Sequence, residues 1–174
     1  MKPKRLFVAI DFPQSVRAFL FDLDPQIRGV RWIAAEQMHL TLGFFGDVPE
    51  DVDAKFREKL SAIHFGAFFL PLAGVGTFPP KGPPKIIWIG TGRGHPHLFQ
   101  LHKRVTDADL AVGLEPDLRL FHPHITLAQS MRKFLQTNVD LDAGMVHVES
   151  FHLYSSELTP AGPIHTPQLT VSWN

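Results

Sequence analysis

The chain has 174 residues, with 17 acidic and 17 basic side chains, so its formal net charge is zero. Its apolar content of 44% and charged content of 20% are ordinary for a soluble globular protein. A protein that grips a long nucleic acid by its phosphates normally has a basic excess, so any nucleic-acid partner is expected to be a short piece or a chain end.

Cysteine is absent, which excludes disulfides, thiolate metal sites and a cysteine nucleophile. The absence fits a reducing compartment, and a cytoplasmic location is expected. The basic start is followed by an apolar run that Asp11 and Pro13 cut short, which argues against a secretion signal. No stretch approaches the ~20 apolar residues of a membrane span, so no membrane contact is expected.

The first part of the chain alternates strands with a helix. Residues 5–11 are apolar and predict a buried strand, after which Ser15 is a suitable helix N-cap. Residues 30–33 predict a short strand, and residues 38–45 predict a longer one that Gly46 ends.

The remaining segments continue this mixture. Pro49 and the two acids after it predict a helix start, because acids suit the positive end of the helix dipole. Residues 65–78 are apolar and rich in glycine, which favours strand, bend and strand, and residues 85–90 predict another strand. The apolar spacing from Leu98 to Leu110 predicts a third helix. Two closing strands are expected at residues 146–155 and 168–173.

A histidine and a threonine two residues apart occur twice, as His39-Leu-Thr-Leu and as His124-Ile-Thr-Leu. Because strand side chains alternate between two faces, His39 and Thr41 share one face, and His124 and Thr126 do the same. One copy alone is explained as a half-exposed strand, but the repetition favours a paired site. The surrounding elements are loosely echoed, which predicts an α+β fold of two pseudo-symmetric, mostly antiparallel lobes with outer helices and a central cleft.

Two imidazoles that face each other across a cleft can transfer protons in both directions, because histidine titrates near pH ~6.5. The two threonine hydroxyls are then placed to hold an anion between the strands. A phosphodiester needs this combination of a base, an acid and donors for its non-bridging oxygens. No phosphate-binding glycine loop or serine nucleophile motif competes with this interpretation.

The motifs resemble a known superfamily over nearly the whole chain. Its pattern is matched by Arg5-Leu-Phe-Val-Ala-Ile-Asp, by both histidine motifs, by Phe121-His-Pro-His before the second, and by Leu153-Tyr-Ser-Ser. The chain resembles the two-histidine phosphoesterases, and among them the bacterial and archaeal RNA 2′,3′-cyclic phosphodiesterases, also known as 2′-5′ RNA ligases. The resemblance implies one bilobal domain over residues 1–174 that opens a terminal 2′,3′-cyclic phosphate to a 2′-phosphate without metal or cofactor.

The resemblance also implies residue roles. His39 and His124 are the expected catalytic pair, with His124 as the base that activates water and His39 as the acid that protonates the departing 3′ oxygen. Thr41 and Thr126 are expected to bind substrate. The implied partners are RNA 3′ ends, short oligonucleotides and cyclic nucleotides, and the protein is expected to be a monomer.

Further candidates carry weaker signals. His122 shares a face with His124, Phe7 and Trp32 are aromatics that would stack a base, and Arg132 is a candidate phosphate contact. His95, His97 and His102 are poorly spaced for a metal site and are expected at a solvated helix start.

Two positions depart from the family pattern. Relatives often have arginine where this chain has Gln129, and often have a tyrosine in the late segment that here ends in His165. Strand alternation turns Gln129 away from the cleft unless the strand ends or twists by Ala128. The polar residues that follow favour an end there, which would let the side chain reach over the cleft. Both departures bear on phosphate affinity and substrate preference.

Two rival functions remain open at this stage. The same site run in reverse would join a 5′-hydroxyl to the cyclic phosphate, or would cleave 2′,5′-linked RNA. A binding module that recognises RNA ends without catalysis would keep the cleft as well.

Overall fold

The computed structural model describes residues 4–79, 81, 85–92, 95–115, 117, 119–130 and 142–174. In this part of the chain, one eight-stranded sheet has the order β10-β9-β1-β3-β7-β6-β5 with β2 paired to β7, and β4 and β8 form a second sheet. Every strand pairing in the two sheets is antiparallel. The strands are β1 (Lys4–Ile10), β2 (Val30–Trp32), β3 (Leu40–Val48), β4 (Phe68–Ala73), β5 (Val75–Phe78), β6 (Ile86–Gly90), β7 (His124–Ser130), β8 (Asp142–Val148), β9 (Ser150–Thr159) and β10 (Gly162–Ser172).

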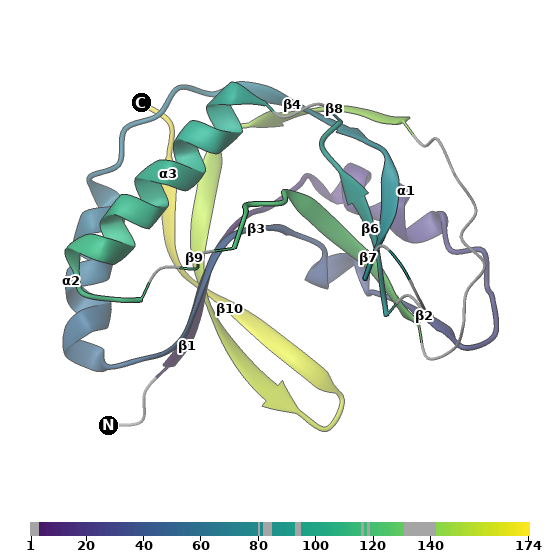
Figure 1. Ribbon diagram of the computed structural model, residues 1–174, viewed down its shortest axis with the longest axis horizontal. Coiled ribbons are helices and arrows are strands. Elements are labelled where there is room, and N and C mark those ends of the chain that lie inside the picture. The colour runs from purple at the N-terminus through teal and green to yellow at the C-terminus, as the bar shows by residue number, and fades with distance from the viewer. Residues whose placement is uncertain are drawn as a thin grey trace.

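The helices lie outside the sheets. Figure 1 shows α2 and α3 on the side of β1, β9 and β10, and α1 on the other side, near β2 and β7. Strands β3 and β7 meet near the middle, so the large sheet continues from one side of the molecule to the other. The helices are α1 (Gln14–Asp22), α2 (Glu50–Ser61) and α3 (Pro96–Ala111), and η1 (Ala35–Gln37) is a short 3-10 helix.

One apolar core runs beneath both sides of the large sheet. It contains Phe56 of α2 and Leu98 of α3 together with Leu40 of β3 and Ile125 of β7, all fully buried. The mostly antiparallel sheets with outer helices confirm the predicted α+β class. The pseudo-twofold relation between lobes and the single domain over residues 1–174 stay predictions.

Helix α2 shows how charge fixes an outer helix to the sheet. Its first turn carries Glu50, Asp51 and Asp53, which favour the positive end of the helix dipole. Arg57 pairs with Asp53 at 2.8 Å and donates a hydrogen bond of 3.0 Å to the side chain of Gln168 on β10. The ion pair one turn apart thus also ties the helix to the sheet.

Several predicted boundaries are wrong. The strand expected at residues 146–155 is divided between β8 and β9, and the last strand begins at Gly162 and not at residue 168. Helix α1 begins at Gln14 and has no side-chain cap from Ser15, because the Pro13 carbonyl accepts the first helical amide bonds at 3.0 and 3.1 Å. Gly46 does not end its strand, since β3 continues to Val48. Gly46 has a φ of 64° where the register with β1 is irregular, so the glycine accommodates a bulge there and not a turn.

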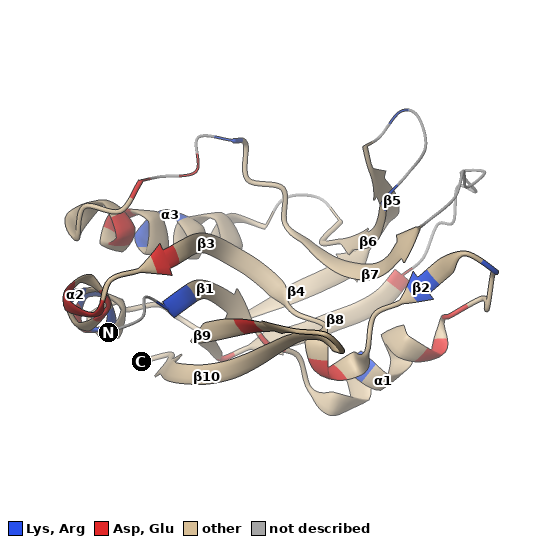
Figure 2. Ribbon diagram, turned by 90° about the horizontal axis from the view of Figure 1, so that it is seen from below, with Lys and Arg blue, Asp and Glu red and all other residues tan. Residues whose placement is uncertain are grey.

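Helix α3 has the predicted position, but one residue of its predicted apolar stripe is wrong. Leu110 is 50% exposed, because the buried face passes instead through Val105 and Asp109. None of the helices in the described residues is long and apolar enough to cross a membrane. Figure 2 shows basic and acidic residues interspersed along the elements, which agrees with the zero net charge.

Candidate active site

The contact between β3 and β7 brings the two histidine motifs together. Leu40 and Ile125 are directly opposite each other in antiparallel register. Extending this register by one residue places His39 opposite Thr126 and Thr41 opposite His124. Opposed residues of antiparallel strands point to the same side, so these four polar side chains share one face of the sheet. We call this face the cleft face.

The two histidine rings are held in the same way. The Nδ1–H of His39 donates to the backbone carbonyl of Gln37 at 2.8 Å, and the Nδ1–H of His124 donates to that of His122 at 2.7 Å. A carbonyl oxygen only accepts, so in each neutral ring the proton lies on Nδ1 and the lone pair on Nε2. Both motifs therefore leave one nitrogen for proton transfer.

His39 lies in the more enclosed of the two environments. Its ring centroid is 5.0 Å from that of Phe7 and 5.5 Å from that of His165, which meets it edge-on at 90°. Burial, and then the neighbouring His165, lower the pKa of His39 to about 4. The free protein therefore holds His39 neutral at physiological pH.

His124 lies among different neighbours. Phe78 meets the ring edge-on at 5.1 Å, and Trp88 lies 6.2 Å away by ring centroids. Burial lowers the pKa of His124 as well, while its hydrogen bond to the His122 carbonyl opposes this shift. The predicted substrate-binding residue His122 is exposed and lies 5.9 Å from His124, so the structure does bring it to the site.

His165 is a third histidine beside the pair. It projects from β10 against both His39 and Phe7, and its Nδ1 is buried with no hydrogen-bond partner in the described residues. The side chain of Gln37 donates to the Pro163 carbonyl at 2.9 Å, which ties the β9–β10 hairpin to the segment that orients His39. The sequence marked His165 only as a departure, because nothing local shows that β10 passes this motif.

Gln129 lies on the cleft face, although simple alternation turns it away. The expectation that the strand ends near Ala128 is wrong, because β7 continues to Ser130. The pairing with β6 shifts by one residue between Thr126 and Ala128, so Leu127 is the extra residue of a β-bulge. Leu127 and Ala128 are both buried, and the residue after them returns to the side of Thr126.

Strand β2 pairs with this end of β7. Arg31 is directly opposite Gln129 and so shares the cleft face, whereas Trp32 is opposite the buried Ala128. The Trp32 indole donates to the Leu20 carbonyl of α1 at 3.0 Å and packs against the core. The structure therefore does not bring Trp32 to the histidine pair. It adds Arg31, a cation that the sequence analysis did not single out because β2 and β7 are distant in the chain.

Phe7 and Arg132 were the other predicted contacts. Phe7 is 3% exposed and lies between the rings of His39 and Tyr154, the latter at 5.2 Å. Phe7 therefore packs against the His39 ring and is too buried to stack on a base. Arg132 lies outside the described residues.

The three histidines near α3 do not act as one group. His95 and His97 stack on Phe68 at 5.3 and 5.8 Å, so the expected solvated helix start is partly packed. His102 lies apart from them and stacks on Phe121 at 3.8 Å. In the described residues, no three metal-binding side chains gather closely enough to hold an ion.

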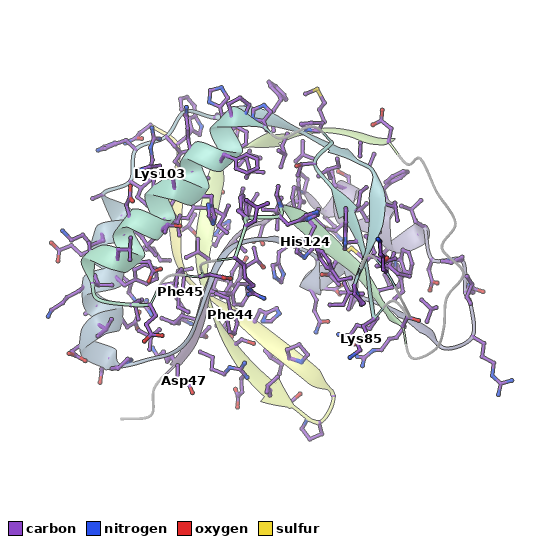
Figure 3. All side chains as sticks on the ribbon, viewed as in Figure 1. Phe44, Phe45, Asp47, Lys85, Lys103 and His124 are labelled. Atoms are coloured by element: carbon purple, nitrogen blue, oxygen red, sulfur yellow. The ribbon has the colours of Figure 1, made fainter. Side chains whose placement is uncertain are left out.

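A pocket of about 490 Å³ opens beside the pair. It is lined by Thr41 and His124, by Phe44 and Phe45 of β3, and by the inner face of α3. Figure 3 shows His124 near the middle of the molecule, with Phe44 and Phe45 to its lower left. The volume lies in the ~300–1,000 Å³ range of small-molecule sites.

Two facing His-x-Thr strands across an antiparallel sheet, with a pocket at their junction, define a phosphoesterase of the two-histidine type. The family model of LigT-like phosphoesterases matches residues 10–88 and 90–165. The chain belongs to the LigT-like phosphoesterase family.

Known relatives agree with this placement. The chain is 35% identical over 144 residues to an RNA 2′,3′-cyclic phosphodiesterase of Aeropyrum pernix, which covers 78% of this chain and 82% of the relative. It is 33% identical over 170 residues to the enzyme of that name from Archaeoglobus fulgidus, covering 92% and 96%. The crystal structure of Escherichia coli LigT with 3′-AMP superposes with a TM-score of 0.86 at 26% identity and 98% coverage of both chains.

Proposed function

We propose that this protein hydrolyses 2′,3′-cyclic phosphates at RNA ends or on nucleotides, leaving a 2′-phosphate and a 3′-hydroxyl. The observation that carries the proposal is the pair of opposed histidines, each with its Nδ1–H donated to a backbone carbonyl and with no hydrogen bond to its Nε2 from the described residues. The relatives named RNA 2′,3′-cyclic phosphodiesterase supply the substrate class.

The reaction needs two proton transfers. The Nε2 of His124 removes a proton from water as the water oxygen attacks phosphorus. The bond from phosphorus to the 3′ oxygen then breaks, and the Nε2–H of His39 gives its proton to that oxygen. His124 ends protonated and His39 neutral, and exchange with solvent restores the starting state.

The threonines stabilise charge on the phosphate. Each hydroxyl lies across the strand pair from a histidine, at the level where the phosphate would lie between the two Nε2 atoms. Each hydroxyl donates to a non-bridging oxygen, on which negative charge builds up in the transition state. No metal takes part in this scheme.

The acid role of His39 requires a proton on a ring whose pKa is about 4 in the free protein. A phosphate anion bound beside the ring favours its charged form and raises that pKa. Substrate binding thus helps to charge His39.

The decisive experiment supplies an oligonucleotide with a 2′,3′-cyclic phosphate end in the presence of EDTA and identifies the product end. We expect a 2′-phosphate at an undiminished rate. Loss of activity in EDTA with recovery in Zn²⁺ or Mn²⁺ would contradict the metal-free scheme. Binding without turnover would support the non-catalytic module.

Ligation is the second candidate, because a 5′-hydroxyl can take the place of water. His124 would remove the proton of that hydroxyl as its oxygen attacks phosphorus, the bond to the 3′ oxygen would break, and His39 would protonate the departing 3′ oxygen. Adding an RNA with a 5′-hydroxyl to the same assay tests it. A joined 2′,5′ product would show ligase activity, and its yield against hydrolysis would give the balance.

A further inference from the structure

The pocket beside the histidine pair has a second end, away from the phosphate position. Helix α3 forms its wall with His102, Thr106 and Asp109, which are spaced to lie on one face of the helix. The same pocket is also lined by Thr41 and His124 of the two motifs. A ligand whose phosphate lies between the motifs therefore extends toward α3.

Asp109 is the unusual residue of this wall. Asp109 is only 3% exposed, and its Oδ1 is buried with no hydrogen-bond partner in the described residues. Burial raises the pKa of its carboxyl to about 6. A buried carboxyl oxygen without a hydrogen-bond partner destabilises a fold, so the presence of one in a pocket wall indicates a ligand that supplies the missing hydrogen bond.

A neighbouring acid on the same helix shows the ordinary alternative. Asp107 is exposed and pairs with Lys103 at 3.1 Å one turn before it. An exposed acid in an ion pair of this kind is the ordinary arrangement on the solvent face of a helix. Asp109 faces inward instead.

The pocket walls suit a flat ring. Phe45 and Phe121 line it, and the His102 ring lies on Phe121 with an interplanar angle of 4°. Aromatic walls favour stacking with any base, while a polar group at the end of the pocket reads the edge of that base.

We propose that this end of the pocket binds the nucleobase of the nucleotide that carries the cyclic phosphate, and that Asp109 selects guanine. The inference rests on the proposed function for the phosphate end. An ionised carboxylate can only accept hydrogen bonds, and its two oxygens lie side by side. Guanine presents two adjacent donors, the ring N1–H and the exocyclic amino group, whereas adenine, cytosine and uracil present only one donor group on that edge.

The test compares guanosine, inosine, adenosine, cytidine and uridine 2′,3′-cyclic monophosphates as substrates at pH 7.5, where Asp109 is ionised. A matched pair of hydrogen bonds to a base edge discriminates between bases, so we expect kcat/KM for guanosine to exceed that for uridine by about 10-fold, chiefly through KM. Inosine lacks the amino group and should fall between them. Asp109→Asn should remove the guanosine preference by raising the KM for guanosine 2′,3′-cyclic monophosphate.

Asp107→Asn is the matched control on the same helix and should keep the preference. Equal kcat/KM for all bases in the wild type, or an Asp109→Asn variant that keeps the guanosine preference, would overturn the proposal. If Asp109→Asn raised the KM equally for all five substrates, the proposal would also be overturned, because Asp109 would then contact the sugar that they share and not the base.

Binding separates this inference from the proposed function. The five corresponding nucleoside 2′-monophosphates are titrated into the protein by calorimetry. A guanosine preference that Asp109→Asn removes supports the base site even if no cyclic phosphate is hydrolysed. Absent preference overturns it even if all are hydrolysed.

Discussion

The two histidine motifs are nearly identical in sequence and in backbone contacts, but they lie in different surroundings. His39 is enclosed by Phe7 and His165, whereas His124 adjoins Phe78 and the exposed His122. Enclosure lowers the pKa of His39 to about 4, and that of His124 falls below its usual value against an opposing hydrogen bond. The repeated motif orients the two Nε2 atoms in the same way, and the neighbours of each ring make the two pKa values different.

The inequality has a consequence for the proton roles. In the active form of the enzyme, one of the two histidines is protonated and the other is neutral. The fraction of enzyme in this form depends on pH in the same way whichever ring holds the extra proton. A pH profile therefore measures the pair, and other experiments must separate the two rings.

Removing either ring has the largest expected effect. His39→Ala and His124→Ala should each lower kcat by ~10²–10⁴, because each removes one proton transfer. The double variant should lose little more. His147→Ala is the control, since His147 is a partly exposed residue that pairs with Glu149. Thermal unfolding should show all four variants folded. Activity within tenfold of wild type in either single variant would falsify the pairing.

A sulfur leaving group separates the two roles. A substrate with sulfur in place of the 3′ oxygen expels a thiolate, which needs no proton donor. If His39 is the acid, the rate of His39→Ala relative to wild type should be roughly 100-fold higher on this substrate than on the oxygen substrate. The relative rate of His124→Ala should not change. Recovery in His124→Ala alone would reverse the assignment.

The threonines give the next largest effect. Thr41→Val and Thr126→Val keep shape and β-branching but remove a donor to the charged phosphate, so each should lower kcat/KM by about 10- to 100-fold. Unfolding temperature should change much less. Thr166→Val at an exposed position of β10 is the control. Unchanged activity in both site variants would return them to ordinary strand residues.

Gln129 tests the far end of the second motif. Because the bulge turns it to the cleft face, Gln129→Arg should lower KM several-fold and steepen its dependence on salt. Arg31→Ala and Arg132→Ala should each raise KM, and Gln100→Arg on the exposed surface of α3 should do nothing. If the substitutions at Gln129, Arg31 and Arg132 all left KM unchanged, position 129 would lie outside the site.

The smallest effect concerns His165. The wild-type kcat/KM should peak below pH 6.5, because both histidine pKa values are lowered. His165→Phe removes a positive charge that opposes protonation of His39, so the pKa of His39 and the acidic limb of the profile should rise by a few tenths of a unit. NMR titration of the His39 ring measures the shift, with His147→Phe as control. An unmoved acidic limb would show that His165 only packs there.

Most of the fold and the central pair were predictable from local patterns. Alternation along each strand put His39 and Thr41 on one face and Leu40 in the core, because successive strand side chains point to opposite sides. The repetition of that pattern indicated a paired site. The α+β class followed from strands that adjoin without helices between them.

The failures came from interactions that a local pattern does not contain. Gly46 was expected to end a strand, but pairing with β1 carries that strand through a bulge. Gln129 was expected to reach the cleft because its strand ended near Ala128, but the strand continues, and a bulge at Leu127 that depends on the register with β6 turns Gln129 to that face. Trp32 was considered for base stacking, while its contacts with α1 and the core place it on the other side of the sheet.

The pair of His-x-Thr strands and the kind of bond they are suited to act on follow from the amino-acid sequence alone, since side-chain chemistry and period-two alternation are local properties. The neighbours of each histidine follow only from the folded arrangement of the chain. His165 reaches His39 from β10, and Asp109 reaches the pocket from α3, through contacts between segments far apart in the chain. Burial and proximity set the pKa of a ring and the partners of a carboxyl, and both quantities arise only when distant segments pack together.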